Sequence, residues 1–182
     1  MTEWRDATAF FLTSGEGDDE RWLRSLSERI DLRSEGLAFD EYSRTLNCEW
    51  AGLECRAEVI SGPTGGTLVI SYFARDFRDD VAAQPDRWRE FCHLFARACL
   101  DLAPTAAVAL GTISDDVRSD IHEFDRLIAE RNAVGLRDSW YALLYLAPGL
   151  EPAAVPDAAP PSHQLPNGGL VSWDWRYDDF PE

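Results

Sequence analysis

The stretch from residue 67 to residue 102 constrains the fold more than any other part of this chain. An apolar run at 68–73 is followed, after a charged connection, by a helical pattern at 87–102. The run is apolar at both of its alternating positions, which is typical of a strand covered on both faces. We therefore expect a strand in the middle of a sheet, with a helix packed across that sheet.

The helical pattern places apolar side chains at steps of three and four, so that they share one face of a helix. These residues are Trp88, Phe91, Cys92, Phe95, Cys99 and Leu102. Pro85 is tolerated in a first helical turn, and Pro104 cannot continue a helix. The pattern predicts a helix that begins near residue 85, ends by residue 103 and buries this face.

Further elements are predicted on both sides of this pair. Residues 53–60 alternate apolar and polar, as in a strand with one covered face, and the glycine-rich link at 62–66 suits an antiparallel hairpin. Apolar residues at helical spacing predict helices at about 18–33 and 115–131. The remaining predicted strands are one or two within 37–50, and one each at 106–113, 140–146 and 170–175. Residues 8–13 are either a short strand or the apolar segment that precedes the first helix.

These elements together predict an α+β fold. We expect a largely antiparallel sheet of about five to seven strands, with two or three helices packed mainly on one face. The 182 residues suffice for one domain, 1–182, with its own core. Residues 150–166 are rich in Pro, Ala and Ser, and are expected to form an extended surface connector without packing of its own.

The net charge and the basic residues of the chain limit the classes of function that it can have. Acidic residues number 33 against 17 basic ones, the formal charge is -16, and the chain contains no lysine. Such a field repels phosphate backbones and attracts basic proteins, so nucleic-acid binding is disfavoured. The absence of lysine excludes a P-loop lysine and Schiff-base chemistry. A GC-rich genome or a salt-adapted host would also produce this composition.

The cysteines and the N-terminus give no sign of export or of a metal centre. Cys92 and Cys99 lie two helical turns apart, about 10 Å, which is too far for a disulfide. Cys48 and Cys55 can face one another only if their strands pair, and no CxxC spacing suggests zinc. There is no signal-peptide pattern and no run long enough to cross a bilayer. We expect a cytoplasmic protein without a cofactor and without membrane contact.

The end of the chain carries the candidate partner-binding residues. These are Trp173, Asp174, Trp175, Tyr177, Asp178 and Asp179. The two tryptophans share strand parity, and acidic residues are interleaved with the rings. Aromatic rings inside an acidic surround suit the capture of a protein surface rich in arginine or lysine. The alternative is that the tryptophans cover the core and the acids are simply solvated.

An acidic cluster on the predicted 115–131 helix is an alternative site. Its residues are Asp115, Asp116, Asp120, His122 and Glu123. Such a cluster can hold a divalent cation, but the HExxH and EF-hand spacings are absent, and a solvated helix face is the simpler interpretation. No serine lies in a sequence motif typical of a nucleophile. Cys92 and His93 are adjacent on the predicted helix, so their side chains point about 100° apart and cannot act as a nucleophile and its base. No catalytic residue is therefore assigned.

The C-terminal region resembles a known family. The aromatic run at 140–146 precedes Pro-rich coil and the segment Leu165-Pro166-Asn167-Gly168-Gly169-Leu170-Val171. This order is similar to that of small cytoplasmic immunity proteins of bacterial polymorphic-toxin and effector pairs, some of which end in a comparable Leu-Pro-x-Gly-Gly-apolar segment. The resemblance covers about the last quarter of the chain, and the N-terminal half shows no family pattern. It implies a protein without catalytic residues that binds and blocks a toxin, often through acidic residues.

We therefore expect a non-catalytic immunity or inhibitor protein that docks on a basic surface of its partner. One alternative is a metal-assisted hydrolase or transferase that uses the acidic cluster. Another is a salt-adapted structural or assembly subunit. The three differ in what they require, namely a basic partner protein, a bound divalent ion, or high salt for stability.

Overall fold

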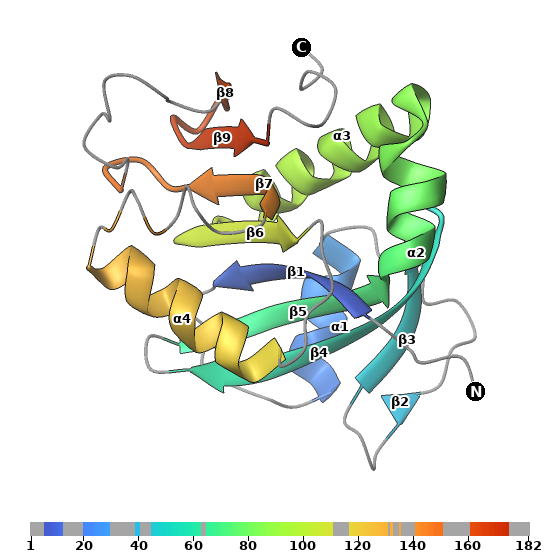
Figure 1. Ribbon diagram of the computed structural model, residues 1–182. Coiled ribbons are helices and arrows are strands. Elements are labelled where there is room, and N and C mark those ends of the chain that lie inside the picture. The colour runs from blue at the N-terminus through green and yellow to red at the C-terminus, as the bar shows by residue number, and fades with distance from the viewer. Residues whose placement is uncertain are drawn as a thin grey trace.

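The fold is given by a computed structural model, which describes residues 6–12, 20–29, 39–40, 45–62, 65–110, 117–130, 132, 135, 141–150 and 161–174 (Figure 1). The elements in chain order are β1 (Asp6–Leu12), α1 (Glu20–Arg29), β2 (Phe39–Asp40), β3 (Thr45–Trp50), β4 (Leu53–Gly62), β5 (Gly65–Phe73), α2 (Ala74–Asp76), the π-helix η1 (Phe77–Ala82), α3 (Pro85–Leu102), β6 (Ala106–Leu110), α4 (Val117–Ala129), β7 (Tyr141–Leu146), β8 (Ser162–Gln164) and β9 (Leu170–Trp173). The predicted α+β class is confirmed.

The described strands form one nine-stranded sheet in the order β2-β3-β4-β5-β1-β6-β7-β9-β8. Every pairing is antiparallel, as predicted. The two edge strands, β2 and β8, have only two and three residues. Strands this short carry no readable alternation, which explains why the sequence indicated five to seven strands.

The predicted central strand is confirmed. Residues 68–73 belong to β5, which lies inside the sheet between β4 and β1. β4 and β5 form the expected hairpin, in which Gly62 pairs with Gly65. β1 is a full strand in the middle of the sheet and pairs with β5 and β6. The sequence had left two alternatives for this segment, a short strand or the apolar segment before a helix.

Helices cover both faces of the sheet. On one face, Phe91 and Phe95 of α3 pack with Phe11, Trp50 and Tyr72 from the strands, and α1 joins the same core. On the other face, α4 packs its apolar residues over β5, β6 and β7, and Figure 1 shows this helix in front of the sheet with α1 behind it. Most of the helical residues thus share one face, as predicted, while α4 alone covers part of the second.

The helix α3 agrees closely with its prediction. Pro85 is its first residue, and every predicted core position of its apolar face is buried. It ends at Leu102 and is capped by Ala103, whose φ of 47° is left-handed and whose N–H donates to the carbonyl of Cys99 at 3.1 Å. The charged connection before it is itself helical, since α2 and η1 wind through it and bury Phe77 and Val81. No helix among the described residues is long and apolar enough to cross a membrane.

Part of the predicted surface connector belongs to the sheet instead. Ser162–Gln164 form β8 and pair with β9. Leu165 is 5% exposed and packs in the main core. The prediction of a connector without packing is therefore wrong for this part, because a three-residue strand among prolines has no pattern of its own. Residues 151–160 of the predicted connector lie outside the described residues.

Candidate interaction surface

The predicted partner-binding residues are described only in part. Trp173 ends β9 on the same face as Val171, is 7% exposed and belongs to the main core. Asp174 is half-buried, and its N–H donates to the carbonyl of Ala142 at 3.3 Å. The prediction that Trp173 grips a partner is therefore wrong, because its strand parity turns the ring into the core. Trp175, Tyr177, Asp178 and Asp179 lie outside the described residues.

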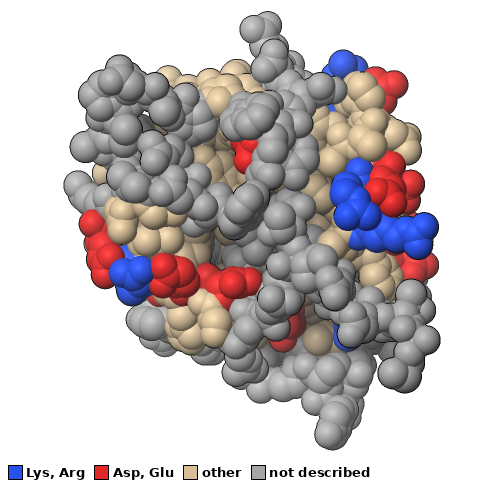
Figure 2. Space-filling view, viewed as in Figure 1, with Lys and Arg blue, Asp and Glu red and all other residues tan. Residues whose placement is uncertain are grey.

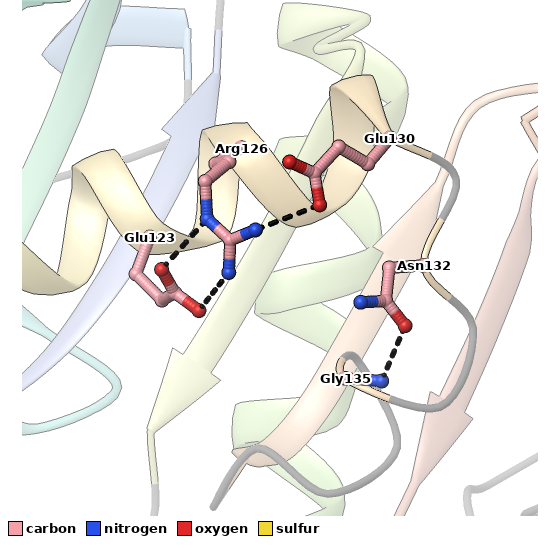
Figure 3. Close-up of polar contacts among 5 residues, drawn as sticks. All are labelled: Glu123, Arg126, Glu130, Asn132 and Gly135. Carbon is pink, nitrogen blue, oxygen red and sulfur yellow. Dashed lines mark hydrogen bonds and ion pairs between the residues drawn. The ribbon is translucent and has the colours of Figure 1, made fainter.

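The acidic cluster of the alternative site is partly engaged within α4. Both carboxylate oxygens of Glu123 accept hydrogen bonds from Arg126, at 3.0 and 2.7 Å, and Arg126 also donates to Glu130 at 2.7 Å (Figure 3). The hydrogen bonds from Arg126 lower the pKa of Glu123. Asp115 and Asp116 lie outside the described residues. No three potential metal ligands gather anywhere in the described part of the chain.

The segment that carries the family resemblance forms the turn between β8 and β9. The N–H of Leu165 donates to the carbonyl of Gly169 at 2.8 Å, and the N–H of Gly168 donates to the carbonyl of Leu165 at 2.8 Å. Asn167 accepts from the N–H of Gly169 at 3.0 Å and donates to the Tyr145 hydroxyl at 2.9 Å. A Cβ on Gly169 would lie 2.3 Å from the Tyr145 ring. These contacts give the residues of this segment a structural role.

The described cysteines are buried and free. This agrees with the prediction that Cys92 and Cys99 act as small core residues. Burial raises the pKa of both thiols. Cys48 and Cys55 do face one another, because β3 and β4 pair.

The hairpin of β3 and β4 has a tight tip that is fixed to α3. Trp50 pairs with Leu53, and the two residues between them, Ala51 and Gly52, have φ of 53° and 71°. Two left-handed residues in a row are typical of a type I′ turn. Arg87 of α3 donates to the carbonyl of Ala51 at 2.6 Å, and a Cβ on Gly52 would lie 2.3 Å from its guanidinium. Arg87 therefore connects the tip of the hairpin to the first turn of α3.

The outward side of this hairpin, on the face of the sheet that α4 partly covers, places like charges side by side. Glu49 on β3 lies directly opposite Glu54 on β4, next to the pair of Asn47 and Arg56, with Glu58 further along β4. Glu54 and Arg56 are exposed, and Glu49 and Glu58 are half-buried. We call these five residues the hairpin face. Three carboxylates surround its single guanidinium, so the face is acidic overall.

The turn decides how closely the first two carboxylates approach. Across a two-residue turn the flanking pair is hydrogen-bonded, and the next pair, Glu49 with Glu54, is therefore of the non-hydrogen-bonded kind, in which Cα atoms lie only about 4.5 Å apart. Like charges in such direct opposition destabilise a sheet. The sequence did not reveal this pair because Ala51 is an uncommon residue at positive φ, so the register of the hairpin was not predictable.

Positive charge elsewhere on the described surface is largely neutralised locally. Arginines on α2, η1, α3 and α4 pair with acids on the same or the adjoining helix, and Figure 2 shows blue and red atoms side by side over these helices. The ion pairs are Arg75–Asp79, Arg78–Asp79, Arg87–Glu90, Arg89–Asp86, Arg97–Asp101, Arg126–Glu123 and Arg126–Glu130. Exposed pairs of this kind add little stability, but they leave the acidic excess of the chain uncompensated.

These features define an α+β protein with an antiparallel sheet and an acidic hairpin face. Comparison of the chain with models of protein families, with curated proteins and with solved structures found no match. The functional argument therefore rests on the residues of this chain.

Proposed function

We propose that this chain is a non-catalytic binding protein of the immunity or inhibitor type, which docks an acidic surface on a basic surface of a partner protein. The opposition of Glu49 and Glu54 on the hairpin face is the observation that carries the proposal. Carboxylates in direct cross-strand opposition repel one another, so the pair concentrates negative charge at one point of the surface. An arginine or lysine of a partner, placed between the two carboxylates, would remove the repulsion and gain charge-assisted hydrogen bonds.

Rigidity of the hairpin supports the same function. Arg87 fixes the tip, and β4 is paired on both sides, with β3 and with β5. The carboxylates are therefore held in place before a partner arrives, so less conformational freedom is lost on binding. The net charge of -16 accelerates encounter with a basic protein at low salt.

The nature of the partner follows from the family resemblance. Immunity proteins neutralise toxins, so we propose a cytoplasmic protein whose partner is a toxin or effector encoded nearby. The Leu165–Val171 segment contributes to this function indirectly, because its contacts hold the β8–β9 turn against β7. The acidic and aromatic residues beyond Asp174 remain part of the proposal as a second contact region.

Isothermal titration tests the proposal with the toxin encoded beside the gene. The double variant E49Q/E54Q should weaken binding by about 10-fold or more, as expected when charged groups at an interface are removed. The control D86N/D101N removes two exposed carboxylates from α3, on the opposite face of the sheet, and should change affinity by less than about 3-fold. Equal losses in the two variants would show that only net charge matters. No binding of the unmodified chain at micromolar concentration to this toxin or to the products of the other neighbouring genes would remove the proposal.

A further inference from the structure

Cys48 and Cys55 lie directly opposite one another on β3 and β4, on the face of the sheet that carries α3. They follow the Glu49–Glu54 pair, so the alternation of the ladder makes them a hydrogen-bonded pair with Cα atoms about 5.5 Å apart. That separation falls within the range of about 4.4–6.8 Å found in disulfides. The Cα separation of this pair is therefore compatible with a disulfide, which would require the two Cβ atoms to move slightly closer together.

Both thiols donate to backbone carbonyls of β4. The Cys48 Sγ lies 3.8 Å from the carbonyl oxygen of Cys55, and the Cys55 Sγ lies 3.1 Å from that of Leu53. A hydrogen bond between the thiols is the main cause of a raised pKa at Cys55, with burial second. Both residues are free, at 4% and 7% exposure. Cys92 and Cys99, by contrast, lie two turns apart on α3 and cannot meet.

We propose that Cys48 and Cys55 form an oxidisable dithiol, which a small peroxide converts to a disulfide within the β3–β4 hairpin. In the first step the sulfur of Cys48 attacks hydrogen peroxide and the O–O bond breaks. Cys48 becomes a sulfenic acid, and its thiol proton joins the departing hydroxide to give water. Cys55 stays protonated until the second step because its pKa is raised.

In the second step the sulfur of Cys55 attacks the sulfur of Cys48, the S–S bond forms and the S–O bond breaks. The departing hydroxide takes the proton of Cys55 and leaves as a second water. The two thiols together lose two electrons, and one hydrogen peroxide is reduced to two waters. The product ties β3 to β4 directly beneath the hairpin face.

Burial of the pair determines which reagents act on it. Hydrogen peroxide is small enough to reach thiols that are only a few per cent exposed, whereas a bulky maleimide should label them only after unfolding. Once formed, the disulfide is shielded from glutathione for the same reason. We expect slow formation and slow reduction in the folded protein.

The test uses the full chain, fully reduced and then exposed to hydrogen peroxide. The intact mass should fall by that of two hydrogens, and cleavage after Glu49 and Glu54 without reductant should yield the Cys48 and Cys55 peptides joined together. The oxidised protein should unfold at a temperature several degrees higher, about 5 °C by loop-closure entropy. C48A and C55A should each abolish the link, and C99A should retain it.

Peptide mapping of the unmodified chain decides the outcome even if a variant fails to fold. The proposal is overturned if both thiols stay reduced after prolonged exposure to peroxide. It is also overturned if Cys48 proceeds to the sulfinic acid while Cys55 remains unlinked, or if the cross-link joins either residue to Cys92 or Cys99. It does not depend on the proposed binding function, since the readout requires no partner.

Discussion

Replacing Glu54 by glutamine should stabilise the folded protein. The substitution keeps the size of the side chain and removes one of the two carboxylates that oppose each other across β3 and β4. At a separation of about 5 Å in water, two unit charges repel by about 0.8 kcal/mol, and salt at 0.1 M reduces this to about 0.5 kcal/mol. This agrees with the usual size of cross-strand pair effects. The free energy of unfolding should therefore rise by about 0.5 kcal/mol.

Urea unfolding followed by tryptophan fluorescence measures this gain. The midpoint should rise at 0.1 M salt, and most of the gain should disappear at 1 M salt, where the screening length is about 3 Å. The control D86N removes an exposed acid that is paired with Arg89, and it should leave stability unchanged or slightly reduced. A hairpin face built for binding is expected to show this combination of higher stability and weaker binding on neutralisation.

Two results would refute the reasoning about the hairpin face. If E54Q lowers the free energy of unfolding at low salt, Arg56 bridges the carboxylates and the pair is stabilising. If the gain is the same at both salt concentrations, its origin is packing rather than repulsion between Glu49 and Glu54. Either result would also remove the main support for the proposed function.

Two further predictions concern the β8–β9 turn and α4. G169A should lower the free energy of unfolding by about 2–3 kcal/mol in urea titration, because its Cβ would overlap the buried Tyr145 ring. In the control G149A the new Cβ meets no atom within 4 Å, so this variant should lose only about 1 kcal/mol, through its φ of 83°. Equal losses in the two variants would contradict the packing argument. Because the pKa of Glu123 is lowered, its pairing with Arg126 stabilises the fold at pH values above the ordinary pKa of 4.5, and this stabilisation is lost as the pH falls through the lowered pKa. Urea midpoints measured from pH 6 downward should therefore fall less steeply in E123Q than in the unmodified chain. Identical slopes would exclude a contribution from this pair.

Local patterns predicted the helices well, since an amphipathic helix carries its whole signal in consecutive residues. The buried face of α3 and both of its ends followed from apolar spacing and from Pro85 and Pro104. The position of β1 was not predictable in this way. Its partners, β5 and β6, begin 59 and 100 residues after β1 begins, and no property of Phe10 or Phe11 encodes that pairing.

The candidate site was harder to predict than the fold. Strand parity alone does not say which side of a strand faces the core, and Trp173 proved to face inward. The Glu49–Glu54 and Cys48–Cys55 pairs depend on register, which the Ala51–Gly52 turn sets. Sequence identified the residue types at the surface, whereas the turn determined which of them meet.

The central position of β1 also affects how the chain is made. It is the only described strand that joins the β2–β5 meander to the β6–β9 half of the sheet. It precedes both of its partners in the chain, and its second partner, Ala106–Leu110, begins 100 residues after β1 begins at Asp6. Pairing between strands so distant in sequence is slow, and unpaired apolar strands are prone to aggregate. We therefore expect the nascent chain to need protection by a chaperone until β6 has left the exit tunnel.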